Sequence, residues 1–282
     1  MKRIASIQDF SCLGKCSQTV ALPVLSAMGV ECAALPTAFL STHTAFEGFV
    51  SYDMTECLPC MIDHWQALGV QFDAIYTGYL ASAAQISLVK DFFECFGTPQ
   101  TLRFVDPVMA DHGKLYAGFP EDFPDAMRRL CSRADVLTPN VTEACLLTGL
   151  PYRETHDETY TNALLTALLK LGCKTAVITG IRPDEAHMGV AALQADGTPL
   201  LHLTDYVPAL FHGTGDLFAA SCVGALLRGL SLRSAIALAA DYVVKTIRVT
   251  LKNSEHAWYG VDFEATLPDL MAQLQAKGAD TL

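Results

Sequence analysis

Short apolar runs typical of β-strands alternate with helical runs along almost the whole chain of 282 residues. The strand-like runs are residues 2–8, 31–38, 73–78, 102–106, 135–138, 174–179, 188–194 and 200–206. The helical runs are residues 17–28, 55–68, 82–96, 123–131, 158–171, 216–228, 231–251 and 267–276. This alternation predicts a three-layer α/β/α fold, in which helices cover both faces of a mostly parallel sheet. The turn signal Asp196-Gly197 predicts a hairpin between the last two strands.

The composition is that of a folded protein with a large core, since 51% of the residues are apolar and 17% are charged. No linker, repeat or low-complexity segment divides the chain, so we expect a single domain over residues 1–282. No apolar run reaches the roughly 18 residues that cross a bilayer, and the N-terminal residues lack the pattern of a signal peptide. We therefore expect a cytoplasmic protein without a membrane partner, whose ten cysteines stay reduced.

The net charge of −11 argues against a nucleic-acid partner, because binding to a phosphate backbone needs a basic surface. A small anionic ligand would instead have to be held locally, by backbone amides and a metal ion. The charge balance thus restricts the ligand classes before any motif is considered.

The clearest chemical signal is Gly213-Thr214-Gly215-Asp216, which opens an apolar helical run rich in small residues. Glycines allow backbone amides to approach a ligand, and the first amides of a helix lack intrahelical partners, so they can hold an anion. An aspartate beside that anion can accept the proton of a hydroxyl group that attacks a phosphoryl group. The alternative is that Asp216 only caps the helix.

Two polar clusters near the N-terminus follow predicted strands. The first is Asp9-Phe10-Ser11, which could also be an ordinary turn. The second is Ser41-Thr42-His43-Thr44, whose hydroxyls and imidazole suit hydrogen bonding to a heteroaromatic ring. Because ligands of parallel sheets lie outside the carboxyl ends of the strands, both clusters are candidates for one shared site.

Two more clusters follow strands in the middle of the chain. Asp106 emerges directly from a predicted buried strand, although Asp-Pro is also a common turn. Asn140 and Glu143 have the spacing of a capping box, which predicts a helix that starts there. Capping by Asn140 is compatible with a Glu143 carboxylate that faces a metal ion or its waters. Such indirect ligation suits Mg²⁺ in phosphoryl transfer, because Mg²⁺ keeps much of its water shell.

Together these elements carry a resemblance to a known family. Asp106-Pro107-Val108, Asn140-x-x-Glu143 and Gly213-Thr214-Gly215-Asp216, in this order and spacing, resemble the ribokinase superfamily of small-molecule kinases. The segments Ile7-Gln8-Asp9-Phe10-Ser11-Cys12-Leu13-Gly14 and Ser41-Thr42-His43-Thr44 resemble its vitamin B6 branch, the pyridoxal and pyridoxamine kinases. The resemblance covers nearly the whole chain and implies a ribokinase-like fold.

The resemblance implies ATP-dependent phosphorylation of the 5′-hydroxymethyl group of pyridoxal, pyridoxamine or pyridoxine, as in salvage of vitamin B6. Asp216 would be the general base and would contact the substrate, while the anion hole would be formed by the amides of Gly213, Thr214 and Gly215. The residues implied in ATP binding are Asp106, Asn140, Glu143 and Thr179. Asp106 and Glu143 would also organise Mg²⁺, partly through water, and Thr44 would contact the pyridine ring.

One position departs from the family pattern. Asp9 stands where many pyridoxal kinases have a serine, and Ser11 follows two residues later. The carboxylate could pair with a cationic group of the vitamer. Alternatively, Asp9 braces the loop and Ser11 contacts the substrate. The preferred vitamer stays open.

Several alternatives also stay open. The nearest is a hydroxymethylpyrimidine kinase of thiamine synthesis, which keeps the chemistry and changes the heteroaromatic substrate. A sugar kinase and a non-catalytic vitamer-binding protein fit the sequence less well. The resemblance further leads us to expect a homodimer, and it leaves open whether a monovalent cation assists. Residues 206–211 are a candidate for a loop that covers the nucleotide.

Overall fold

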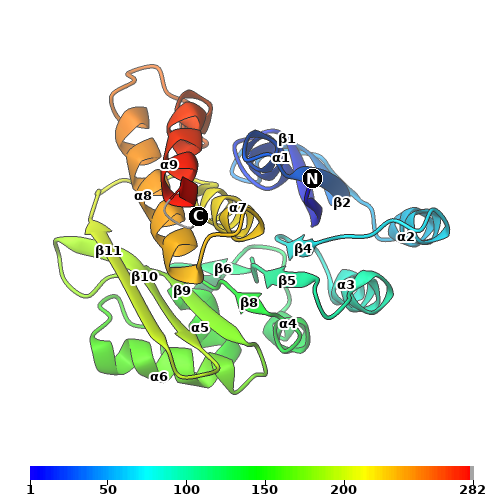
Figure 1. The fold of residues 1–282 in the computed structure, drawn as a ribbon, viewed down its shortest axis with the longest axis horizontal. Coiled ribbons are helices and arrows are strands. Elements are labelled where there is room, and N and C mark those ends of the chain that lie inside the picture. The colour runs from blue at the N-terminus through cyan, green and yellow to red at the C-terminus, as the bar shows by residue number, and fades with distance from the viewer. Residues whose placement is uncertain (280–282) are drawn as a thin grey trace. The chain divides into compact units, whose positions relative to one another are not determined.

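The computed structural model describes residues 1–279, which fall into two compact units. The first unit combines Met1–Met54 with the chain from Val207 onward, and the second unit is Thr55–Tyr206. Each unit has its own strands and helices, most of which are labelled in Figure 1.

The first unit contains a parallel strand pair and a group of helices. Its strands are β1 (Arg3–Leu13), β2 (Glu31–Thr42) and β3 (Ser51–Asp53), and β2 pairs in parallel with β1 and antiparallel with β3. Its helices are α1 (Gln18–Ala27), α7 (Thr214–Leu227), α8 (Leu232–Thr250) and α9 (Leu267–Ala279), with a short 3₁₀ helix, η1 (Phe263–Ala265). Helix α1 packs on both long strands and on α7, which also packs on α8. Helix α7 thus lies in the apolar core of this unit, and residues 217–225 are buried.

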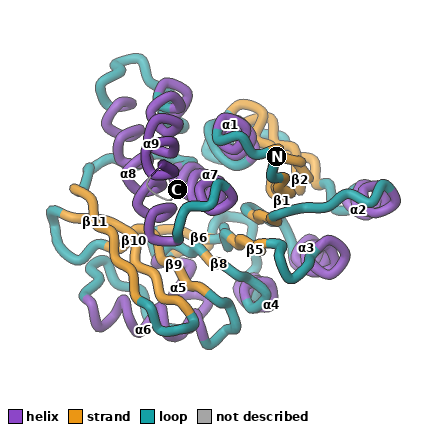
Figure 2. Tube along the Cα trace, viewed as in Figure 1, coloured by secondary structure: helices purple, strands orange, loops and turns teal. Residues whose placement is uncertain are grey.

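The second unit contains strands in the order β11-β10-β9-β8-β5-β4. These strands are β4 (Ala74–Thr77), β5 (Leu102–Val105), β8 (Val136–Leu137), β9 (Thr175–Ile181), β10 (His187–Gln194) and β11 (Pro199–Asp205). The first four are parallel to one another, whereas β10 pairs antiparallel with both β9 and β11. Figure 2 shows these strands in orange, and α6 packs on β9 and β10. The hairpin turns at Gly197, whose φ is +86°, as the Asp-Gly signal predicted.

The helices of the second unit are α2 (Leu58–Ala67), α3 (Ala83–Phe96), α4 (Phe123–Cys131), α5 (Val141–Thr148) and α6 (Glu158–Leu169). A further two-stranded pair consists of β6 (Ala110–Asp111) and β7 (Lys114–Leu115). Three of these helices begin at a residue whose side chain accepts an amide of the first turn, namely Ser82, Asn140 and Asp157. Such caps satisfy amides that have no partner inside the helix.

The predicted α/β class with mostly parallel strands is confirmed, whereas two predicted strand ends are wrong. Strand β1 continues to Leu13 and β2 to Thr42, because their parallel ladder resumes after a register shift between Gln8 and Phe10. The polar residues Asp9 and Ser11 therefore lie inside β1 rather than after it. Within residues 1–279, no helix has the length and apolar character needed to span a membrane.

Candidate active site

The anion-binding element predicted at Gly213 is the N-terminus of α7. Gly213 is the N-cap and has a left-handed φ of 77°. A Cβ atom there would lie 1.8 Å from the carbonyl oxygen of Lys15, so no residue with a side chain fits without a shift of the backbone. At Gly215, in contrast, a Cβ atom would meet nothing within 4 Å. The first turn thus carries amides without intrahelical partners beside open space, which suits an anion.

Asp216 lies in the first turn of α7, three residues after the N-cap Gly213, and is partly exposed. The backbone N–H of Ser17, which precedes α1, faces the Asp216 carboxylate. Burial raises the pKa of Asp216 to about 7; the Ser17 amide opposes this rise and the nearby Asp9 carboxylate adds to it. Asp216 is therefore not the N-cap residue of α7, because Gly213 occupies that position. A carboxylate with a pKa near neutral pH is well suited to act as a general base.

The carboxylate of Asp9 is buried and accepts hydrogen bonds from two hydroxyl groups. One carboxylate oxygen accepts the Ser11 hydroxyl at 2.9 Å, and the other accepts the hydroxyl of Ser17. Asp9 is 4% exposed and Ser11 2% exposed, and burial raises the pKa of Asp9. Of the two roles left open by the sequence, this geometry favours the one in which Asp9 braces the loop.

The segment that contains Thr44 lies next to the anion-binding turn. The imidazole of His43 packs against that of His212 with 4.2 Å between ring centroids and an interplanar angle of 37°, and His212 directly precedes Gly213. Burial, followed by the proximity of His212, lowers the pKa of His43 to about 4, so His43 is neutral at physiological pH. Its Nδ1 accepts the Ala45 amide at 3.1 Å. Thr44 itself is exposed at the end of this arrangement.

In the second unit, Asn140 and Glu143 form the predicted capping box at the start of α5. The Glu143 carboxylate accepts amides on both oxygens: Met109 at 3.0 Å on one oxygen, and Asn140 at 2.9 Å on the other. The Asn140 side chain also donates to the carbonyl of Ala110 at 2.8 Å. Burial raises the pKa of Glu143 to about 8, and the amides oppose that rise. This pair therefore fixes the loop that follows Asp106.

Asp106 and Thr179 complete the cluster in the second unit. Asp106 is 7% exposed and directly follows β5, as predicted. Thr179 lies in β9, where it forms a parallel bridge with Asn140, and it is partly exposed. The structure thus brings the four predicted ATP-binding residues to neighbouring strand ends. This placement follows the rule that ligands lie at the carboxyl ends of parallel strands.

The protein side chains offer few ligands for a metal ion. Among residues 1–279, no three His, Cys, Asp or Glu side chains are grouped so that they could hold one. Glu143 spends both carboxylate oxygens on amides, so its fit as a direct ligand is poor. The residues fit a Mg²⁺ ion that is held mainly by phosphate oxygens and water, with Asp106 as the other carboxylate of the predicted set.

Sequence reasoning missed two residues beside Asp216. The amide of Ser17 faces Asp216 and lowers its pKa. Cys16 is a buried thiol whose pKa is raised by burial and by the nearby Asp216 and Asp9 carboxylates. Ser17 lies at the start of a helical pattern, where a serine normally signals only a cap. Its left-handed φ of 49° marks it as unusual, and no sequence signal predicts that conformation.

An amide-rich helix start with an adjacent aspartate is the arrangement expected of a small-molecule phosphotransferase, and carboxylates at parallel strand ends suit the binding of a nucleotide with its metal ion. The sequence model of the phosphomethylpyrimidine kinase family matches residues 24–259. The chain belongs to this family of the ribokinase superfamily, in the branch that contains the vitamin B6 kinases, and it is an enzyme of the kinase class.

Three relatives place the chain within that family. A pyridoxine/pyridoxal/pyridoxamine kinase of Bordetella avium is 32% identical over 88% of this chain and 85% of its own length. The structure of a phosphomethylpyrimidine kinase of Bacteroides thetaiotaomicron, so named provisionally, has a TM-score of 0.92 and 38% identity, covering 95% of this chain and 93% of that chain. A second crystal form of that protein contains pyridoxal. The pyridoxal kinase of Lactobacillus plantarum has a TM-score of 0.89 and 35% identity, covering 98% of this chain and 99% of that chain.

Proposed function

We propose that this kinase transfers the γ-phosphoryl group of ATP to the 5′-hydroxymethyl group of a B6 vitamer. The observation that carries the proposal is Asp216, a carboxylate with a pKa near 7 that lies in the first turn of α7 beside amides without intrahelical partners. The relative that was crystallised with pyridoxal supports the choice of substrate.

In this mechanism, Asp216 accepts the proton of the hydroxymethyl group while its oxygen attacks the phosphoryl group. The amides of Gly213, Thr214 and Gly215 hold the phosphoryl oxygens, whose negative charge they stabilise without any reorganisation. Ser11 and Thr44 contact the vitamer. On the nucleotide side, Asp106, Asn140, Glu143 and Thr179 hold ATP, with Glu143 acting through the loop amides and through water. When bound with ATP, Mg²⁺ neutralises charge on the phosphates.

A second candidate substrate is hydroxymethylpyrimidine, because the matching family is described as phosphomethylpyrimidine kinase. The pyrimidine is also a flat heteroaromatic ring with a hydroxymethyl arm, so the same base and anion hole could serve it. The two substrates differ in the groups that the ring offers for hydrogen bonding.

The proposal also covers the organisation of the protein. We regard residues 1–282 as one kinase domain, since solved relatives match about the whole chain in a single superposition. A homodimer and a cytoplasmic location are part of the same hypothesis. Residues 206–211, where the second unit ends and the first resumes, stay the candidate for the nucleotide-covering loop.

A coupled assay of ADP release tests the proposal. Purified protein is given ATP and Mg²⁺ with pyridoxal, pyridoxamine, pyridoxine, hydroxymethylpyrimidine or ribose, in Na⁺ or K⁺ buffers. We expect turnover with at least one vitamer, and no turnover after Mg²⁺ is chelated. Higher kcat/KM for hydroxymethylpyrimidine than for every vitamer would transfer the assignment to the second substrate. Turnover that survives chelation would remove the roles given to Mg²⁺.

A further inference from the structure

Ser17 has a backbone conformation that serines rarely adopt. Its φ is 49°, and within residues 1–279 only one other non-glycine residue, His112, has a positive φ. Ser17 is the N-cap of α1, yet its side chain makes no cap hydrogen bond. A residue held in such a conformation costs about 1–3 kcal/mol and persists only where its surroundings enforce it. The strained backbone of Ser17 therefore indicates a role other than helix capping.

The two polar groups of Ser17 point to that function. Its hydroxyl donates to the buried Asp9 carboxylate, and its backbone N–H faces the carboxylate of Asp216 and lowers the pKa of that group. Ser17 is 6% exposed, and Asp9 4%. The left-handed backbone thus places the amide against the base while the hydroxyl is held from β1.

The loop Gly14–Ser17 also supports the anion hole through its backbone. The carbonyl of Lys15 lies where a Cβ atom of Gly213 would be, so the loop and the N-cap of α7 are in direct contact. The hydroxyl of Thr19 closes the loop by donating to the carbonyls of Gly14 at 3.0 Å and Cys16 at 2.7 Å. Gly213 and Asp216, at the two ends of the first turn of α7, therefore both lie against this loop.

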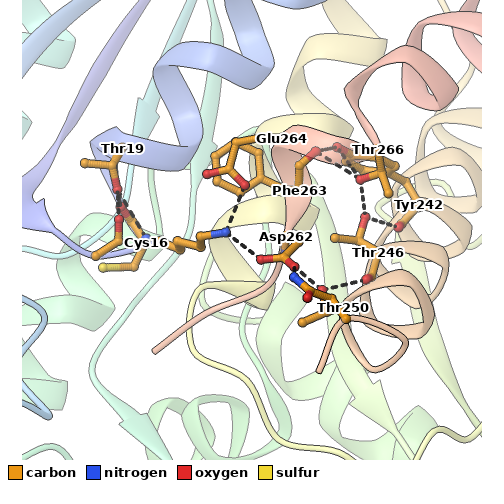
Figure 3. A network of polar contacts seen from close by, with 12 residues as sticks. Cys16, Thr19, Tyr242, Thr246, Thr250, Asp262, Phe263, Glu264 and Thr266 are labelled. Carbon is orange, nitrogen blue, oxygen red and sulfur yellow. Dashed lines mark hydrogen bonds and ion pairs between the residues drawn. The ribbon is translucent and has the colours of Figure 1, made fainter. Parts of the chain in front are cut away.

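The largely buried ammonium group of Lys15 provides a further attachment for the same loop. Lys15 Nζ lies 2.9 Å from Asp262 and 2.9 Å from Glu264, and its side chain is 16% exposed. Figure 3 shows Asp262 and Glu264 within a polar network that continues through Thr250 into α8. Asp262 donates its amide to the Thr250 hydroxyl at 2.8 Å. The loop is thus tied both to β1, by Asp9, and to the segment before α9, by Lys15.

We propose that the loop Gly14–Ser17 positions the general base Asp216, and that Asp9 and Ser17 are positioning residues that do not read the vitamer. Both carboxylate oxygens of Asp9 already accept hydroxyls, so a cationic group of a substrate would have to displace Ser11 or Ser17. The inference rests on the proposed function, because it assigns these residues a role in the same phosphoryl transfer.

The test compares steady-state kinetics and thermal melting of Ser17→Ala and Asp9→Ala with those of Asp9→Asn. The control is Ser231→Ala, which removes a serine N-cap from α8 in the same unit without touching this loop. Because small displacements of reacting groups can cost about 10²-fold, we expect kcat of the two Ala variants to fall by about 10- to 100-fold. KM for pyridoxal and pyridoxamine should change little and equally, and Asp9→Asn should retain more activity, since its amide oxygen still accepts the Ser17 hydroxyl.

The outcomes separate the alternatives. A lower melting temperature with unchanged kcat would reduce the loop to a structural element, as the control variant is expected to behave. A selective rise in KM for pyridoxamine in the Asp9 variants, with kcat retained, would show that Asp9 reads the substrate. If the Ser17 variant does not fold, Lys15→Met decides, because it releases the loop while leaving Ser17 intact; an unchanged kcat then overturns the inference. Lack of turnover by the wild-type protein would instead refute the proposed function.

Discussion

The substitution Asp216→Asn is the most direct test of the chemistry. The asparagine keeps an oxygen that can accept the Ser17 amide, so the contact between α7 and the Gly14–Ser17 loop survives. It removes only the ability to take up a proton. A positioned base contributes about 10²–10⁴-fold to kcat, which equals about 2.7–5.4 kcal/mol of transition-state stabilisation. We therefore expect kcat to fall by that factor.

Folding and binding should survive the same substitution. The carboxylate and its neighbour Asp9 repel each other when both are ionised, and the amide relieves this repulsion. We expect a melting temperature within about 2 °C of the wild type, which corresponds to less than 1 kcal/mol in a chain of this size. The affinity for ATP should be retained, because backbone amides hold the phosphates.

The pH profile adds an independent measurement. Because the pKa of Asp216 is about 7, kcat/KM of the wild type should rise with pH through about 7 as the base loses its proton. The residual activity of the asparagine variant should lack this rise. Turnover, melting and ATP titration on one preparation decide the matter. Wild-type kcat in a folded Asp216→Asn protein would refute the assignment of the general base.

Two further predictions concern the glycines at the start of α7 and the buried carboxylate of Glu143. Gly213→Ala should lower the free energy of unfolding by roughly 1–3 kcal/mol, because its Cβ meets the Lys15 carbonyl at a left-handed φ, whereas Gly215→Ala should melt like the wild type and weaken ATP binding. Equal melting temperatures of the two glycine variants would contradict this contrast. Glu143 has a pKa of about 8 in the folded chain against an ordinary 4.5, so the folded state binds the extra proton and stability falls as pH rises through that window. Between pH 5 and 8, the melting temperature of Glu143→Gln should depend less on pH than that of the wild type. An identical pH dependence would argue against the raised pKa.

Local sequence signals predicted much of the fold. Helix α4 occupies the predicted range of Phe123–Cys131, and the capping box at Asn140 and the Asp-Gly hairpin turn are present. These features depend on neighbours within a few residues, so periodicity and turn chemistry suffice to predict them. Strand β3 and the β6–β7 pair escaped prediction because they are too short to show a period.

The polar face of the site was harder to predict. The sequence pointed to Asp9, Ser11 and Asp216, but it suggested that the first two follow a strand. In the structure they lie within β1, because backbone pairing with β2 continues through polar side chains that hydropathy alone assigns to a loop. The role of Ser17 depends on a left-handed backbone and on its proximity to Asp216, which lies 199 positions later in the chain. Such tertiary constraints leave no local pattern in the sequence.

The discontinuity of the first unit has a consequence for how the protein folds during its synthesis. Helix α7 packs on α1, yet roughly 150 residues of the second unit separate Met54 from Val207 in the chain. At a synthesis rate of about 5–20 residues per second, the N-terminal segment waits about 8 to 30 s on the ribosome before its packing partner emerges. During that interval, the apolar faces of β1 and α1 depend on chaperones or on transient contacts for protection. The second unit is continuous in the chain and is synthesised before α7, so Asp216, the proposed general base, is among the later groups of the nascent enzyme to reach its place.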